Sequence, residues 1–265
     1  MLRTRIITAL LLAGGCLGVL FWLPLPYPAL AFGIVAAIAA WEWAGLIKAG
    51  KLGRYAFPLV TALCCFALFN WPDLQFPVWL LAALFWLGLI PVWLSLRWQL
   101  ASRPLGYLVG LLVIIPAWAA MTMLQSISPM LLLVCMALVW VADIAAYGAG
   151  RLWGRHKLAI HISPGKTWEG AIGAGIAVVI FVFVAAFAYS TPDDPLQPSL
   201  SWVPVLLLLT AVSIVGDLFE SLIKRQAGVK DSSNLLPGHG GVLDRIDSLT
   251  STLPIIAFAL ALVQS

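Results

Sequence analysis

The sequence predicts an all-α, polytopic integral membrane protein, a bundle of about nine transmembrane helices. The 265-residue chain is 62% hydrophobic and 10% charged, whereas about a quarter of the residues in a soluble domain are charged. Apolar runs of about 20 residues recur along it, which matches a hydrocarbon core of ~30 Å. No run alternates with period two, as the strands of a membrane barrel do. The runs are therefore expected to be helices, which satisfy their own backbone hydrogen bonds in lipid.

Nine apolar runs and the prolines between them define the expected helices. Pro24, Pro26 and Pro28 separate the first two runs, and Pro129 opens the sixth. The third and ninth runs are short, so their ends are the least defined. The expected spans are residues 6–22, 28–47, 55–71, 77–96, 105–124, 129–147, 169–189, 202–222 and 249–264.

One integral membrane domain is predicted over residues 1–265, because the chain has no soluble stretch, internal repeat or long linker. Residues 1–140 would supply the N-terminal helices, and residues 141–265 the catalytic helices with their cytoplasmic loops. The four cysteines all lie in apolar runs and form no CxxC pair. Neither a zinc site nor a disulfide framework is therefore expected.

The distribution of positive charge predicts how the chain is oriented. Every Lys and Arg lies before the first span or after the second, fourth, sixth or eighth, which is one side of the membrane if there are nine spans. The opposite loops carry only Asp73, Asp193 and Asp194. Because cytoplasmic loops carry the excess of Lys and Arg, we expect an inner-membrane protein with a cytoplasmic N-terminus and an external C-terminus. This bias explains the net charge of +4, and no nucleic-acid partner is predicted.

Two predicted cytoplasmic segments, residues 143–169 and 217–247, hold 15 of the 26 charged residues and all three histidines. In the first segment, Asp143 lies one turn inside the sixth span, and Tyr147 follows on the same helical face. A carboxylate inside a span is a functional residue by default. The sequence therefore marks Asp143 as a candidate site residue.

The stretch SPGKT, which ends at Lys166 and Thr167, invites comparison with a phosphate-binding P-loop. That motif needs a glycine five residues before Gly165, where this chain has Ile160, and no strand is expected before it, so the stretch does not favour a P-loop NTPase. A basic loop with Thr167 as a helix cap remains the interpretation. The N-terminus of a helix can still bind phosphate.

The end of the eighth span places four polar residues on one helical face. Asp217, Glu220, Ser221 and Lys224 are spaced i, i+3, i+4 and i+7. An ion pair between Glu220 and Lys224 at the interface would account for those two alone. Asp217 lies deeper, where a carboxylate costs roughly 2.5–3.5 kcal/mol and is usually functional.

Glycines surround a histidine in the following stretch, PGHGG. Gly238, Gly240 and Gly241 permit positive φ angles, so successive N–H groups can converge on an anion. The simpler explanation is that these glycines only turn the chain. His239 is interpreted either as a hydrogen-bond donor to phosphate or as a brace of the loop.

Charged side chains around this loop suit a phosphate-rich ligand. Asp244 and Asp247 are spaced i, i+3, on one face if the ninth helix has begun, and Mg²⁺ is usually held by one or two carboxylates together with phosphates. The cations that would neutralise the ligand are Lys224, Arg225, Lys230 and Arg245. The residues therefore predict a cytoplasmic pocket for metal-assisted phosphoryl or nucleotidyl transfer.

Residues Ser221 to Asp247, SLIKRQAGVKDSSNLLPGHGGVLDRID, resemble the signature of the phosphatidate cytidylyltransferases, also called CDP-diacylglycerol synthases. That signature reads S-x-x-K-R-x-x-x-x-K-D and then P-G-H-G-G-x-x-D-R-x-D, and every fixed position matches. The stretches DIAAYGAGRLWGRHKL and ISPGKTWEG resemble upstream motifs of the same family. Gly165 departs from the pattern, because a second basic residue is expected beside Lys166. The first 140 residues resemble the family only in hydrophobic character.

This resemblance implies that CTP and phosphatidic acid react to give CDP-diacylglycerol and pyrophosphate. It implies that Asp217 and Asp244 hold Mg²⁺, with a monovalent cation such as K⁺ beside it, and that Lys224, Arg225 and Asp143 act with them in catalysis. The residues that would bind the substrates are Lys166, Thr167, Ser221, Lys230, Asp231, Gly238, His239, Gly240, Gly241, Arg245 and Asp247. The expected partners are CTP, phosphatidic acid, the lipid bilayer and a second copy of the chain in a homodimer.

Two other functions compete with this one. A different membrane transferase or kinase, using CTP or a UDP-sugar on a polyprenyl phosphate, would share the metal and the pocket. An ion-coupled transporter would also contain carboxylates in its spans, but its sites lie near the bilayer midplane between repeats. Here the charges gather at one face and no inverted repeat is found.

Overall fold

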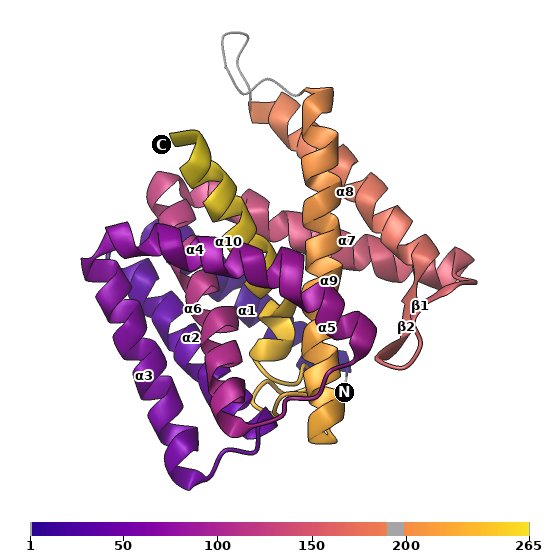
Figure 1. Ribbon diagram of the computed structural model, residues 1–265. Coiled ribbons are helices and arrows are strands. Elements are labelled where there is room, and N and C mark those ends of the chain that lie inside the picture. Colours follow the sequence, from indigo (N-terminus) through magenta and orange to yellow (C-terminus); the bar gives the residue numbers. More distant parts are fainter. Residues whose placement is uncertain (1, 190–198, 265) are drawn as a thin grey trace.

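The protein is a bundle of long helices with one small β-hairpin (Figure 1). This computed structural model describes residues 2–189 and 199–264, with side chains over residues 7–188 and 199–263. Asp193 and Asp194 lie outside the described residues. The elements in chain order are α1 (Leu2–Trp22), α2 (Tyr27–Leu46), α3 (Lys51–Asn70), η1 (Pro72–Leu74), α4 (Gln75–Ala83), η2 (Leu84–Leu89), α5 (Ile90–Leu96), α6 (Arg103–Ile127), α7 (Pro129–Trp153), β1 (Lys157–Ala159), β2 (Ser163–Thr167), α8 (Trp168–Tyr189), η3 (Leu200–Trp202), α9 (Val203–Ala227) and α10 (Leu243–Gln264).

Eight helical runs in the described part of the chain are long and apolar enough to cross a membrane. One of them, Pro72–Leu96, joins η1, α4, the π-helix η2 and α5. The predicted first span coincides with α1, whose apolar stretch Ile7–Trp22 is shorter than the other eight. The predicted polytopic helical bundle is therefore confirmed.

Several helices continue beyond the apolar runs that predicted them. Helix α9 runs on to Ala227 and ends at Gly228, which has a φ of +81°, a left-handed conformation typical of the residue after a helix. Helix α10 begins at Leu243 rather than at residue 249. Hydropathy detects only the length of a helix that lies within the membrane, whereas polar residues can extend the helix into water. Asp244 and Asp247 therefore both lie in α10, at its start.

A two-stranded antiparallel hairpin, β1 paired with β2, connects α7 to α8. The SPGKT stretch forms strand β2, so the expectation of a loop there, with no strand before it, was wrong. The cap prediction is confirmed, because the Thr167 hydroxyl accepts a hydrogen bond from Gly170 N at 3.1 Å, at the start of α8. A side-chain oxygen at this position satisfies a backbone N–H that has no partner within the helix.

Helix α10 packs against α2, α4, α6, α7 and α9, which makes it central to the bundle. Helix α9 is fixed by Phe219, whose ring packs edge-on against Phe85, Trp86 and Trp93 at centroid distances of 5.7–5.9 Å and stacks on Trp43. Edge-to-face pairs are a preferred arrangement of buried aromatic rings. This aromatic core holds α9, one turn before Lys224, against α2 and the α4–α5 run.

The basic connections between helices gather at one end of the bundle. Lys48 and Arg103 line a pocket together with the C-terminal end of α9, and Arg97 lies with Lys157 around a second pocket. Figure 1 shows the chain's N-terminus at this end and its C-terminus at the other. The orientation of this end toward the cytoplasm stays a prediction.

Candidate active site

Lys224 of α9 holds two carboxylates together at the start of α10. Its Nζ donates to Glu220 Oε2 at 2.8 Å, one turn back, and to Asp244 Oδ1 at 2.6 Å, across the helix pair. The three side chains are only 4–11% exposed. The ion pair expected between Glu220 and Lys224 is therefore present, but it is part of a buried triad. Such charges are tolerated in a low-dielectric interior only when they are paired.

Asp217 forms an ion pair with a lysine of the β-hairpin. Lys166 Nζ lies 2.6 Å from Asp217 Oδ2, and Ser221 Oγ donates to Asp217 Oδ1 at 3.2 Å. The side chains of Lys166 and Asp217 are 22% and 28% exposed, respectively. The two polar segments of the sequence thus meet at this pair, on the more accessible side of the Lys224 triad.

Asp143 approaches the same place from α7. It lies within electrostatic range of Asp217, Lys166 and Arg245. Its i+4 neighbour Tyr147 is occupied elsewhere and accepts a hydrogen bond from Arg151 Nη1 at 3.0 Å. The upstream carboxylate and the downstream cations that the sequence selected therefore converge in three dimensions.

Asp247 lies within electrostatic range of Glu220 and Asp217, between α9 and α10. Glu220 Oε1 and the hydroxyls of Ser213 and Ser248 are buried and make no hydrogen bond among the described residues. Ser213 lies two turns from Glu220 on the same face of α9. Buried oxygen atoms without a donor are rare, and an oxygen-rich, acidic environment is what hard cations bind. We call the whole group, Asp143, Lys166, Asp217, Glu220, Lys224, Asp244 and Asp247, the carboxylate–lysine cluster.

The predicted metal ligands bind lysines in this structure. Asp217 contacts Lys166, and Asp244 contacts Lys224. Over residues 7–188 and 199–263, no three His, Cys, Asp or Glu side chains are arranged as a ready metal site. An ammonium group and a metal ion both bind carboxylate oxygen atoms, so a cation at either carboxylate would compete with its lysine.

The PGHGG stretch forms a tight turn. Leu236 N donates to Gly240 O at 2.8 Å, and His239 N donates to Leu236 O at 2.9 Å. Gly238 and Gly240 have φ angles of +77° and +84°, which glycine adopts without a Cβ clash. These two glycines therefore turn the chain. Gly241 does not have a positive φ.

The N–H groups after the turn do converge on anions, but the anions are carboxylates of the protein. Gly241 N donates to Asp244 Oδ2 at 2.7 Å. Val242 N and Leu243 N donate to Glu42 at 2.9 and 2.7 Å. Phosphate binding by this glycine stretch stays a prediction.

Glu42 is a site residue that sequence reasoning missed. It lies in α2, is 1% exposed and contacts residues 232, 233, 242 and 243 from the other half of the chain. A carboxylate inside the apolar run 28–47, five residues before its end, is the same signal that selected Asp217, and it would have identified Glu42 too.

Other predicted residues lie around the cluster without joining it. Arg225, Lys230 and Asp231 are exposed, and their side chains make no hydrogen bond or ion pair with described residues. Arg245 is exposed on the side toward Asp143. His239 Nδ1 is buried without a hydrogen-bond partner in the described part of the chain, which leaves both interpretations of this side chain open.

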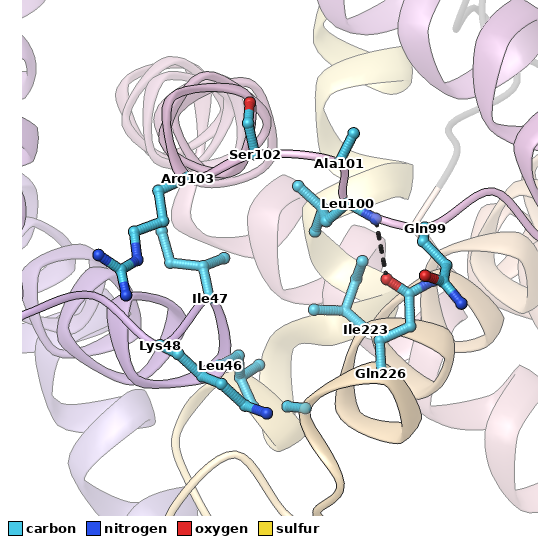
Figure 2. A pocket seen from close by; sticks show the side chains of 11 residues that line it. Leu46, Ile47, Lys48, Gln99, Leu100, Ala101, Ser102, Arg103, Ile223 and Gln226 are labelled. Atoms are coloured by element: carbon cyan, nitrogen blue, oxygen red, sulfur yellow. Dashed lines mark hydrogen bonds between the residues drawn. The ribbon is translucent and has the colours of Figure 1, made fainter.

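A pocket of about 420 Å³ opens beside the cluster, at the end of α9. Figure 2 shows it between the ends of α2 and α9 and the connection to α6, with Lys48 and Arg103 on one side and Ile223 on the other. The Gln226 side chain closes one wall by accepting from Leu100 N at 3.1 Å. None of the carboxylates of the cluster lines this pocket.

Comparison with known proteins gives one consistent result. The sequence model of the cytidylyltransferase family matches residues 3–263. This chain belongs to the cytidylyltransferase family. Among its relatives, the phosphatidate cytidylyltransferase of Pseudomonas aeruginosa is 43% identical, over 97% of this chain and 96% of the relative. That of Haemophilus influenzae is 34% identical, over 97% and 98% of the two chains. That of Brucella suis is 51% identical over 122 residues, 45% of this chain and 43% of the relative.

Proposed function

We propose that this enzyme transfers the cytidylyl group of CTP to phosphatidic acid, giving CDP-diacylglycerol and pyrophosphate. The observation that carries the proposal is the convergence of Lys166, Lys224 and the acidic side chains at one end of a membrane bundle. Full-length similarity to relatives named phosphatidate cytidylyltransferase supports the substrates. A membrane enzyme at the lipid surface can bind a water-soluble nucleotide and a lipid phosphate together.

In this reaction an oxygen of the lipid phosphate attacks the α-phosphorus of CTP, and the bond to the bridging oxygen of the leaving pyrophosphate breaks. The phosphate monoester is already largely dianionic at neutral pH, so no separate base is needed. Lys166 lies at the more accessible side of the cluster and would bind phosphate oxygens there. Arg225, Lys230 and Arg245 have no ion-pair partner among the described residues and would bind the rest of the phosphates.

We further propose that Asp217 and Asp244 hold Mg²⁺, with K⁺ as a second cation. Glu220 Oε1 and the hydroxyls of Ser213 and Ser248 have no hydrogen-bond partner among the described residues, and these buried oxygen atoms support a cation site here. When bound, a divalent cation would neutralise charge that develops on the transferring phosphate. Displacement from Asp217 would free Lys166 for the nucleotide.

The proposed location is the inner membrane, with the N-terminus and the cluster on the cytoplasmic side. This location follows from the one-sided distribution of Lys and Arg, and it would give the site access to CTP. The homodimer stays a prediction.

Purified protein in detergent tests the proposal directly. With CTP, Mg²⁺ and phosphatidic acid it should release pyrophosphate and form a labelled liponucleotide. Undecaprenyl or dolichyl phosphate should neither replace nor compete with phosphatidic acid, and a UDP-sugar should not replace CTP. Turnover with a polyprenyl phosphate and none with phosphatidic acid would instead establish the alternative membrane transferase.

A further inference from the structure

Glu42 is a buried carboxylate with an unusually complete set of donors. Its Oε1 accepts from Ser233 Oγ at 2.6 Å and from Val242 N at 2.9 Å. Its Oε2 accepts from Leu243 N at 2.7 Å and lies 3.2 Å from Ser232 Oγ. Among the described residues no cation pairs with it. Its charge is instead balanced by these donors and by the N-terminus of α10, where backbone N–H groups favour an anion.

The part of α2 that carries Glu42 is tightly packed. Its neighbour Trp43 donates from Nε1 to Gly106 O at 2.8 Å on α6 and stacks on Phe219 of α9. Both Glu42 and Trp43 are at most 1% exposed. The carboxylate therefore has a fixed position relative to the helix that carries Lys224.

The donors of Glu42 lead directly to Asp244. Ser232 contacts Asp244 as well as Glu42. Its Oγ lies 2.9 Å from Asp244 Oδ2, and its N donates to the same oxygen at 2.9 Å. Val242 and Leu243, which donate to Glu42, immediately precede Asp244 in the chain. A Cβ on Gly241 would collide with Glu42 and with Ser232, so only glycine fits this approach. The start of α10 is thus held between two carboxylates.

We infer that Glu42 is a positioning residue for the cytidylyl transfer proposed above. It fastens the two ends of the segment 232–243 to α2 and so fixes where Asp244 meets Lys224. It contacts neither substrate and acts through the placement of Asp244. Reacting groups must be held within about 0.5 Å of their productive geometry, and a misplacement of about 1 Å can cost on the order of a hundredfold in rate.

Glu42→Gln is the sharpest substitution because it preserves the shape of the side chain. Each carboxylate oxygen accepts from one backbone N–H, and a backbone N–H cannot reverse its role. Whichever way the amide is oriented, its NH₂ group therefore opposes Val242 N or Leu243 N. Ser233→Ala removes a single donor and serves as the milder variant if Glu42→Gln fails to fold. Gln125→Ala is the matched control: Gln125 is also buried, and it ties α6 to α1 through Leu20 O at 2.9 Å.

Two measurements on the purified full-length protein decide the inference. Below its melting temperature, Glu42→Gln should lower kcat at least about tenfold, with a smaller change in KM for CTP. Hydrogen exchange of residues 230–247 without ligand should accelerate in Glu42→Gln and, less strongly, in Ser233→Ala. Gln125→Ala should lower the melting temperature but leave kcat and the exchange of this segment unchanged.

Wild-type kcat in Glu42→Gln would overturn the inference, whatever the exchange of residues 230–247. So would a general rise in exchange over all helices, with activity lost only in proportion to the unfolded fraction, because Glu42 would then be merely structural. If the wild type does not form the liponucleotide, the proposed function fails. The exchange experiment still decides whether Glu42 holds the segment.

Discussion

Lys166 of strand β2 and Asp217 of helix α9 form an ion pair of 2.6 Å between the two polar segments of the chain. The same Lys166 Nζ also donates to Ile214 O of α9 at 3.4 Å, so this side chain links the hairpin to α9 at two points. The pair is partly exposed, so a ligand can reach it. It is the place where, in the proposed function, a nucleotide and a cation would exchange with groups of the protein.

Removing either predicted metal ligand should abolish turnover. Asp217→Asn and Asp244→Asn should each lower kcat by more than about a hundredfold, because losing a cation that stabilises transferring phosphate costs several kcal/mol of barrier. A chelator should abolish the turnover of the wild type, and added Mg²⁺ or Mn²⁺ should restore it. The melting temperature in detergent serves as the control for folding. Near-normal turnover in either variant would show that the metal is bound elsewhere, and Asp247→Asn would be the next variant to measure.

Lys224→Met should both destabilise the fold and inactivate the enzyme. The substitution leaves Glu220 and Asp244 buried without their cation, which typically costs about 3–5 kcal/mol. The neighbouring Arg225→Met is the matched control, because Arg225 is exposed and has no ion-pair partner among the described residues. It should keep the wild-type melting temperature while turnover falls through weaker phosphate binding. Equal melting temperatures for the two variants would contradict the buried triad.

Alanine substitutions at Gly240 and Gly241 should have different effects. Gly240→Ala places a Cβ at a φ of +84°, which costs roughly 1–2 kcal/mol, so its melting temperature without CTP should fall. Gly241→Ala should crowd Glu42 and Ser232 and reduce kcat as Glu42→Gln does.

CTP with Mg²⁺ should raise the wild-type melting temperature by mass action. Loss of this ligand shift in a glycine variant would support a role in phosphate binding. A variant that melts early but keeps the full shift would leave the stretch as a turn and move the phosphate site to Lys166 and Thr167. His239→Ala should be milder than either glycine change, because the backbone N–H groups remain.

The orientation of the chain can be tested by cysteine labelling. In a variant without the four native cysteines, Lys51→Cys, Arg155→Cys and Lys230→Cys should react with an impermeant reagent only from the cytoplasmic side. Asp73→Cys should react only from outside. The reason is the exclusive placement of Lys and Arg in alternate loops. Labelling of positions 73 and 230 from the same side would refute the nine-span topology.

The sequence by itself determined the membrane class, the approximate spans and most of the charged residues at the cluster. Hydropathy suffices for the first two, because lipid leaves an isolated apolar run little choice but a helix. The i, i+3, i+4 and i+7 spacing then placed Asp217, Glu220, Ser221 and Lys224 on one face, since a helix has a fixed period. The cap at Thr167 followed from equally local chemistry.

Only the tertiary structure decided which partners these side chains find. Lys166 reaches Asp217 because a hairpin, which the apolar pattern cannot reveal, turns it toward α9. The N–H groups after the glycine turn bind Asp244 and Glu42 rather than standing free, and Glu42 comes from a helix some 200 residues earlier in the chain. The spacing of residues within one segment cannot reveal a contact with a residue some 200 positions away. It is the packing of α10 against both α2 and α9 that brings the two halves together.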